Sequence, residues 1–465
     1  MEDELRTKPS KRTVDLTQGN IVSGLVRFSV PLMAGNVLQQ CYNLADTIIV
    51  GRFVGKTALA AVGSAYTLMI LLNSIVLGLS MGAGAYLSIQ FGARDRRGFA
   101  RGHFMSFTAI GIFTVVMNVA AALGVDGLLH FMQVGSEVYG PMRQYTRIIF
   151  CGILATFFYN YFASVLRAVG NSLIPLVFLA LSSVLNIVLD LVFVIGFGWG
   201  IRGAAWATVL SQYVSGLGVL VYTQVRLPQL RFRREAMRFD GPAFRRIASL
   251  AVLTSAQQSI MNFGILLVQG RVNSFGTDVM AAFAAAVKID TLAYSPVQDF
   301  GNAFSTFVAQ NNGARSPERI REGTRKSALA VLVFCLVISA AVFFFGGLFL
   351  RAFAKEPSII AIGVLYLRIE GAFYCLIGFL FMFYGYFRAL ERPAVSTILT
   401  VISLGTRVVL AYGLSALPAL GVKGIWMSIP IGWGLADLAG LAFYFRGRGA
   451  GSAGGICSGA GKENR

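Results

Sequence analysis

Apolar runs of about twenty residues recur along the whole chain, and they constrain its fold more than any other feature. As a helix rising about 1.5 Å per residue, each run can cross a bilayer core of about 30 Å. Hydrophobic residues make up 56% of the 465 residues and charged residues only 13%, a balance that excludes a soluble globular domain. We therefore expect an all-α membrane protein with twelve transmembrane helices.

Basic residues are concentrated in particular loops. The sequence has 40 Lys and Arg against 21 Asp and Glu, a net charge of +19. With the N-terminus in the cytoplasm, most of these cations fall on the cytoplasmic side, chiefly in residues 94–101, 226–238 and 315–326. This bias indicates topology and attraction to anionic lipids, so we expect no nucleic-acid partner. We expect a multi-pass protein of the inner (plasma) membrane with both termini cytoplasmic.

A repeat divides the chain into two halves. Gly55 in "FVGKTALAA" corresponds to Gly276 in "SFGTDVMAA", and the same separation along the chain, the repeat offset, relates Arg167 in "LRA" to Arg388 in "FRA". Five such motifs keep one order and one offset, which indicates two homologous bundles of six helices. Because six is even, the repeats are parallel, and substrate usually lies between such halves.

The repeat also fixes the expected domain boundaries. A cytoplasmic N-terminal arm (1–24) precedes an N-lobe (25–225), and a basic cytoplasmic linker (226–246) leads to a C-lobe (247–446). The tail (447–465) is rich in glycine and is expected to be disordered and cytoplasmic. The two lobes are expected to be pseudo-symmetric.

Two carboxylates break the symmetry of the repeat. Asp190 lies in "NIVLDLVFVIGFG" and Asp46 in "NLADTIIVG", whereas the equivalent positions of the second half are apolar. A charge at the bilayer centre costs roughly 2.5 to 3.5 kcal/mol on insertion scales, so such a residue usually faces a wet cavity or the bundle interior. Both residues lie about 6 to 9 Å below the same membrane surface, where they could share one cavity.

Neutral oxygen-bearing side chains are available at about the same depth. Asn186 lies one helical turn before Asp190, and Thr208 and Asn160 occupy neighbouring runs. We interpret the group as a cation-coupling site for a proton or a sodium ion. The alternative is that both carboxylates are structural, satisfied by water or by a neighbour. Pro31 interrupts the first predicted helix and marks either a static kink or a hinge.

The second half also carries polar residues within its apolar runs. Lys288, Asp290, Tyr294 and Arg407 are candidates for a C-lobe cavity. Two interpretations stay open: the charges neutralise one another, or they contact substrate or a coupling ion.

Catalytic patterns are not evident in the sequence. The chain has two histidines and neither a paired-histidine metal motif nor a nucleophile elbow. We therefore do not expect an enzyme, a metal site or a cofactor. The only ion expected is a transported proton or sodium ion, with its gradient as the energy source.

Several motifs in a fixed order resemble one family. They are "DTIIVGRFVGKTALAAVG", "QFGARD" with its partner "QNNGARS", "LRAVGNSLIP" and "NIVLD". Over nearly its whole length the chain resembles the multidrug and toxic compound extrusion (MATE) transporters of the MOP flippase superfamily. The resemblance implies a V-shaped pair of bundles that exports amphipathic, often cationic compounds in exchange for protons or sodium ions.

The resemblance also assigns residues. Pro31 matches the bending proline of the first helix. Another branch of the family has coupling acids in the seventh and tenth helices, but here the seventh has none and the tenth offers only Glu370. This departure favours coupling in the N-lobe. The positions that match the N-lobe cation site of the DinF-type branch are Asp46, Asn186, Asp190 and Thr208.

A lipid-linked saccharide flippase of the same superfamily is the alternative function. Its cavity would need basic residues for a pyrophosphate, and Arg407, Lys288 and Arg368 give that alternative some support. In either case we expect a monomer whose partners are small amphipathic molecules and membrane lipids.

Overall fold

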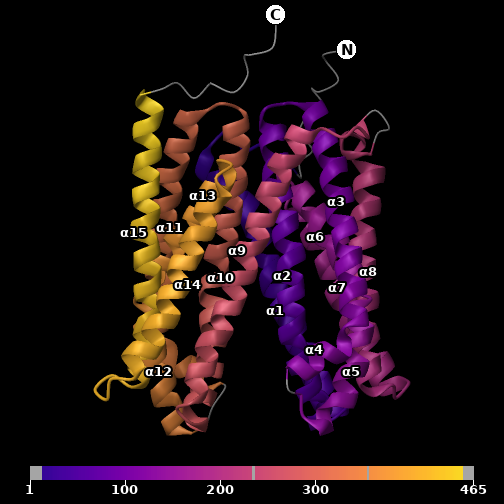
Figure 1. Ribbon diagram of the computed structural model, residues 1–465, viewed down its shortest axis with the longest axis vertical. Coiled ribbons are helices and arrows are strands. Elements are labelled where there is room, and N and C mark those ends of the chain that lie inside the picture. The colour runs from indigo at the N-terminus through magenta and orange to yellow at the C-terminus, as the bar shows by residue number, and fades with distance from the viewer. Residues whose placement is uncertain (1–12, 133, 233–235, 353–355, 454–465) are drawn as a thin grey trace, which may run out of the picture.

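Helices form every regular element that the structure describes (Figure 1). This computed structural model describes residues 13–132, 134–232, 236–352 and 356–453. The first half contains α1 (Ile21–Phe53), α2 (Lys56–Gly92), α3 (Arg96–Leu123), α4 (Val125–Phe131), α5 (Ser136–Phe150), α6 (Ile153–Ala168), α7 (Leu173–Asp190), η2 (Leu191–Gly196) and α8 (Gly200–Arg226). After the short η3 (Pro228–Leu230), the second half contains α9 (Gly241–Asn273), α10 (Thr277–Gly313), α11 (Pro317–Arg351), α12 (Pro357–Gly371), α13 (Tyr374–Ala389), α14 (Pro393–Ser415) and α15 (Val422–Ala453).

Twelve membrane spans account for these elements. Within the described residues, nine helices are long and apolar enough to cross a membrane alone. The pairs α5–α6 and α12–α13, bent by 43° and 52°, each form one further span. The twelfth is α10, which has 37 residues and runs beside the others, but carries Lys288, Asp290 and Asp299 in its interior (Figure 1). The predicted all-α membrane fold is confirmed.

Backbone conformation repeats at the offset found in the sequence. Residues with left-handed φ values mark helix ends, where the chain must turn sharply. Four pairs of them are related by the repeat offset: Gly55 and Gly276 (113° and 98°), Arg94 and Arg315 (57° and 53°), Gly170 and Glu391 (82° and 59°), and Gly200 and Gly421 (55° and 47°). Both halves therefore follow one backbone plan, and Arg167 and Arg388 occupy the last turns of the equivalent helices α6 and α13.

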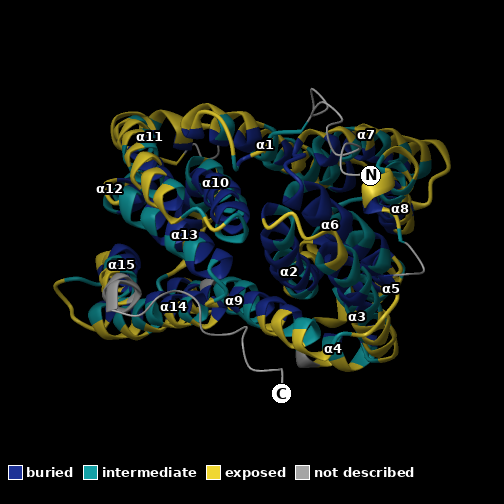
Figure 2. Cartoon of the chain, turned by 90° about the horizontal axis from the view of Figure 1, so that it is seen from above, coloured by how far each residue is buried: buried dark blue, intermediate teal, exposed yellow. Residues whose placement is uncertain are grey.

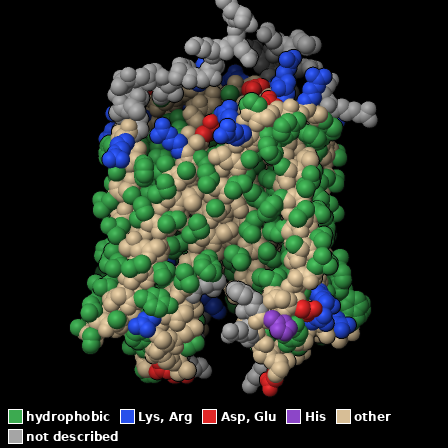
Figure 3. Space-filling model, in the orientation of Figure 1, with side chains coloured by type: hydrophobic (Ala, Val, Ile, Leu, Met, Phe, Trp, Pro, Cys, Tyr) green, Lys and Arg blue, Asp and Glu red, His purple; other side chains and the backbone are tan. Residues whose placement is uncertain are grey.

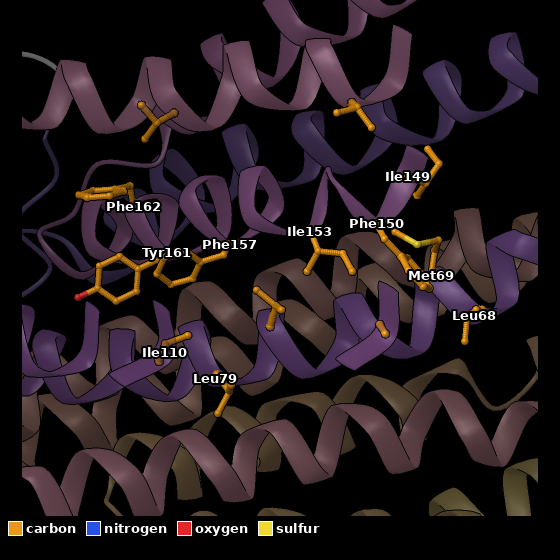
Figure 4. Close-up of a cluster of buried hydrophobic side chains, with 14 of the residues drawn as sticks. Leu68, Met69, Leu79, Ile110, Ile149, Phe150, Ile153, Phe157, Tyr161 and Phe162 are labelled. Carbon is orange, nitrogen blue, oxygen red and sulfur yellow. The ribbon is translucent and has the colours of Figure 1, made fainter. Parts of the chain in front are cut away.

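Each lobe has its own apolar core. In the N-lobe, Phe157, Tyr161 and Phe162 of α6 pack with Leu79 of α2 and Ile110 of α3 (Figure 4). Exposed residues gather on the outer faces of the peripheral helices (Figure 2), and many of them are large and hydrophobic. This distribution is the one expected when lipid, rather than water, covers the outside.

The lobes meet at the end that carries the termini and diverge at the other end (Figure 1). A hollow is visible between them at the end away from the termini (Figure 3). Glycines permit the close packing of α2 on α9: a Cβ atom at Gly78 would overlap the backbone of Ser255, and one at Gly82 the backbone of Leu250. The molecule is therefore V-shaped, as expected.

Two glycines related by the repeat offset allow the lobes to pack closely at the end where they meet. A Cβ atom at Gly92, at the end of α2, would overlap the carbonyl oxygen of Gln310. One at Gly313, at the end of α10, would overlap the carbonyl oxygen of Ile89. Because the repeat offset also relates Ile89 to Gln310, the two helix ends meet in a mutually equivalent way. The pseudo-twofold axis that relates the two lobes therefore passes through this contact.

Part of the N-terminal arm lies across this closed end. Val14 N donates to Gly170 O in the N-lobe at 2.9 Å, and Leu16 N donates to Gln310 Oε1 in the C-lobe at 3.3 Å. The Arg319 guanidinium adds a bond to Gln18 O at 2.8 Å. The described residues of the arm therefore bridge both lobes.

Three boundaries differ from the expected ones. The first helix begins at residue 21 because Asn20 Oδ1 caps it by accepting from Ser23 N at 3.1 Å. The seventh span begins at residue 241, because Asp240 Oδ1 accepts from Ala243 N at 3.1 Å. The last helix continues to residue 453, into the predicted tail. The rest of the tail, 454–465, lies outside the described residues.

Candidate functional site

A pair of carboxyl groups lies inside the N-lobe. Asp46 stands near the end of α1, and Asp190 is the last residue of α7 and fully buried. The two carboxyl groups lie close enough to act on each other electrostatically. One oxygen of each, Oδ1, has no partner among the described residues. Since adjacent carboxylates repel each other, the pair favours a shared proton or a bound cation.

Neutral groups hold this pair in place. With its amide turned to satisfy both ends, Asn186 donates from Nδ2 to Asp190 Oδ2 at 3.3 Å and accepts from Thr208 N at 3.3 Å. Tyr42 and Tyr145 are also close to the pair. Neither carboxylate forms an ion pair with Lys or Arg in the described parts of the chain. The negative charge therefore remains available to a mobile cation.

A π-helical segment follows Asp190 directly. In η2 the helix widens, and at its end Phe197 N donates to Val192 O, five residues back, at 2.9 Å. Single π turns inside helices are frequent at functional sites. The Asp190 carboxylate therefore lies directly before a stretch of the span whose backbone hydrogen bonds depart from the regular α-helical pattern. Nothing in the sequence pattern predicted this segment.

Two other predicted residues are placed differently. Asn160 donates from Nδ2 to Thr156 O in its own helix at 2.9 Å, and no hydrogen bond ties it to the carboxyl pair in the part of the chain that the structure describes. Pro31 lies inside α1, which is continuous from residue 21 to residue 53. Its role as a hinge remains a prediction.

A second carboxyl pair lies inside the C-lobe. Asp290 of α10 and Glu370 of α12 are 5% and 1% exposed and are in hydrogen-bonding contact with each other. Tyr374 donates to Asp290 Oδ1 at 2.6 Å and Tyr366 donates to Oδ2 at 3.4 Å. The guanidinium of Arg407 on α14 acts electrostatically on both carboxyl groups. The tyrosine hydroxyls therefore satisfy Asp290, whereas Glu370 Oε1 and Arg407 Nε have no hydrogen-bond partner among the described residues.

The predicted C-lobe residues come together only in part. Tyr294 and Arg407 lie near Asp290, whereas Lys288 is exposed. A spacing of two residues turns a side chain to another face of the helix, which explains the separation. The partnership of Asp290 with Glu370 was missed. No signal within either helix indicates it, because Asp290 belongs to α10 and Glu370 to α12.

Equivalent positions explain why the two pairs differ. The repeat offset relates Asn186 to Arg407, so the position that carries a neutral amide in the N-lobe carries a cation in the C-lobe. A fixed arginine stabilises negative charge permanently, whereas an amide only orients it. The N-lobe pair is thus the better site for an ion that must bind and be released in each transport cycle.

Fold and site together define a class of protein. Two homologous six-helix lobes, joined at one end and parted at the other around buried carboxyl groups, make a multi-pass membrane transporter. The MatE family model matches residues 31–192 and again residues 251–413, once in each lobe. The chain belongs to the MatE family. The resemblance inferred from the motifs is thereby confirmed, while the DinF-type branch remains a prediction.

Named relatives and a solved structure agree with this assignment. The probable multidrug resistance protein YpnP of Bacillus subtilis (strain 168) is 31% identical over 447 residues, which cover 94% of this chain and 98% of that protein. The probable multidrug resistance protein NorM of Thermotoga maritima is 26% identical over 411 residues, covering 87% and 88%. A solved structure described as the outward-facing conformation of a multidrug resistance MATE family transporter matches with a TM-score of 0.88 and 26% identity, covering 96% and 99%.

Proposed function

We propose that this protein is a secondary active multidrug exporter, which expels amphipathic, often cationic compounds in exchange for protons or sodium ions. The observation that carries the proposal is the Asp46–Asp190 pair, which joins a fully buried and a partly buried carboxyl group and forms no ion pair with Lys or Arg in the described residues. Support also comes from the relatives, which are named multidrug resistance proteins. A transporter of this kind performs no covalent chemistry on its substrate, so we infer no enzymatic activity.

Ion binding at the pair would change the balance between helix arrangements. Asp46 belongs to α1 and Asp190 to α7, so an ion held by both carboxylates draws these two helices together. A free-energy difference of about 2.7 kcal/mol between occupied and empty states shifts the populations about a hundredfold. Pro31 gives α1 a point at which to bend, because the backbone hydrogen bond is missing there. Alternation of access would follow from this bending.

The orientation in the membrane is part of the proposal. Lys and Arg gather at the end that carries the termini (Figure 3), which by the positive-inside rule is cytoplasmic. The hollow between the lobes then opens to the outside. We propose that the protein acts as a monomer in the inner membrane and that it has no nucleic-acid partner.

The flippase alternative has less support. It requires basic side chains that are free to bind a pyrophosphate, and Arg407 instead lies beside Asp290 and Glu370. The exposed Lys288 and Arg368 lie on different helices, α10 and α12, and the Arg368 guanidinium lies over the Phe343 ring at 5.4 Å.

Uptake of a fluorescent cationic dye into inverted vesicles tests the proposal. A pH gradient and a sodium gradient are imposed separately, and vesicles without the protein serve as the control. Accumulation that depends on one of the gradients and on the protein is the expected result. Gradient-independent equilibration of the dye would indicate a passive channel and contradict the proposal.

A further inference from the structure

The C-lobe has a half-open cavity that none of the carboxyl-pair residues lines, and Leu435 and Leu438 of α15, which line it, are exposed. Its volume is about 1330 Å³, and it lies between α11, α13 and α15, toward the end that carries the termini. Its rim includes Glu318, Arg321, Glu322 and Arg325 from the first turns of α11. Its walls are largely apolar and aromatic, with Phe304, Phe379, Met382, Phe383 and Tyr386 among them. Its size suits a drug-sized molecule.

A buried carboxylate faces this cavity. Asp437 of α15 lines it and is only 7% exposed. Both of its carboxylate oxygens lack a hydrogen-bond partner among the described residues. At the rim, by contrast, Glu322 is already paired with Lys326 at 2.6 Å. Because a buried carboxylate without a partner is costly, a cation that enters the cavity would stabilise the charged form of Asp437.

The equivalent space in the N-lobe is filled by the protein itself. His103 and Phe107 of α3 are equivalent to Thr324 and Ala328, which line the C-lobe cavity. Against them packs Phe232 of the linker, with its ring centroid 4.4 Å from that of His103 and 5.0 Å from that of Phe107. The linker therefore occupies in the N-lobe the space that stays open in the C-lobe.

Two substitutions at equivalent positions keep the C-lobe space open. Smaller side chains, Thr324 and Ala328, replace the large rings of the N-lobe. Asp437 itself replaces Gly216, whose position in α8 abuts the backbone of Ala155. The cavity is thus specific to one lobe rather than a general property of the fold.

We propose that this cavity binds an amphipathic organic cation that enters from the cytoplasmic side. The cationic group lies on the Asp437 carboxylate and the apolar body lies against Phe379, Met382 and Phe383. A lipid acyl chain would fill the apolar walls but leave the carboxylate without a partner. The inference rests on the proposed export function, and it adds an intake site distinct from the hollow between the lobes.

Two ions of the same shape and opposite charge provide the test. Binding of tetraphenylphosphonium and of tetraphenylborate to the purified full-length protein is measured by equilibrium dialysis in lipid nanodiscs. Neutralisation by Asp437→Asn is expected to weaken phosphonium binding at least about tenfold, the worth of one charge-assisted contact. Borate binding should not weaken. As a control, Asp278→Asn removes a carboxylate that accepts from Ser358 Oγ at 3.0 Å and does not line the cavity.

A second variant keeps the carboxylate and fills the space. At Gly434, which lines the cavity, an added Cβ would lie 3.7 Å from Leu376 Cδ1, an ordinary contact. Gly434→Leu is therefore expected to fold and to reduce phosphonium binding by a similar factor. Wild-type phosphonium affinity in both variants would overturn the proposal, as would equal weakening of both ions by Asp437→Asn.

Dye uptake in vesicles separates this inference from the proposed function. If uptake is driven by a gradient but phosphonium binding does not depend on Asp437, the intake site is rejected and the proposed export function is retained. If phosphonium binding depends on Asp437 but no uptake is driven by a gradient, the intake site is supported and the proposed export function is rejected.

Discussion

The two lobes share one backbone plan and bury one carboxyl pair each, yet they treat the charge differently. In the N-lobe, the neutral Asn186 donates to Asp190, and Asp46 lies close to that carboxyl group. In the C-lobe, tyrosine hydroxyls donate to Asp290, and the nearby Arg407 acts electrostatically on both Asp290 and Glu370. Duplication thus gives a charge that can be exchanged in one lobe and a charge balanced inside the protein in the other.

The largest expected effect comes from neutralising the N-lobe pair. Asp46→Asn and Asp190→Asn should each abolish gradient-driven efflux, because the amide removes the charge that binds the ion. Folding should persist, since a neutral amide costs less to bury than a carboxylate. Transport is measured in vesicles with an imposed gradient, and size-exclusion profiles check folding. Wild-type rates in both variants would show that these acids are structural.

Introducing a C-lobe feature into the N-lobe should have the next largest effect. Asn186→Arg places a fixed cation where the C-lobe has Arg407, so the guanidinium competes with the transported ion for the pair. We expect efflux to fall at least about tenfold, because a close opposite charge stabilises a carboxylate by more than one such factor. Asn186→Met adds similar length without charge and serves as the control. Equal losses in both variants would point to crowding rather than charge.

Removing a carboxyl group from the C-lobe pair should matter much less. Glu370→Gln keeps a hydrogen-bonding group beside Asp290, and Arg407 continues to compensate the remaining carboxylate. We expect initial efflux rates to stay within about fivefold of wild type, since the loss of one neutral contact is worth about 1 kcal/mol. A complete loss of gradient-driven transport would assign ion coupling to the C-lobe and reverse the comparison.

The smallest expected effect concerns an ion-paired acid that the C-lobe lacks. Asp126 of α4 accepts from Arg143 Nη2 at 2.8 Å, and the equivalent residue is Gly347. The hydrogen bond from Arg143 is the main cause that lowers the pKa of Asp126 from its usual 3.8 to about 2. Its stabilising contribution is therefore complete above the usual pKa and is lost as the pH falls through about 2.

Thermal unfolding of Asp126→Asn checks this point. At pH 7 the variant should unfold slightly below wild type, by a small margin because the pair is exposed to solvent. As the pH falls toward 2 the two unfolding temperatures should converge. A difference that persists unchanged at low pH would contradict the role given to the ion pair.

Sequence predicted some features well because their signals are local or repeated. Apolar runs, the repeat offset and an isolated Asp190 in a lipid-length segment need no knowledge of how helices pack. The meeting of Asp46 with Asp190 also followed from depth alone, since each position can be counted from the end of its span.

Other features depend on contacts between distant helices. No periodicity indicates that Phe232 of the linker fills a space beside His103, or that Glu370 lies against Asp290. The π turn after Asp190 likewise depends on packing around the end of the span, where a single extra residue changes the hydrogen-bond pattern. These details required the structure.

Proton release tests most directly whether the N-lobe pair is the ion site. The purified protein is placed in weak buffer with a pH indicator, and sodium or a cationic substrate is added to wild type, Asp190→Asn and Glu370→Gln. We expect wild type and Glu370→Gln to release protons on binding and Asp190→Asn to release none. Release that survives in Asp190→Asn and disappears in Glu370→Gln would contradict the assignment of ion exchange to the N-lobe.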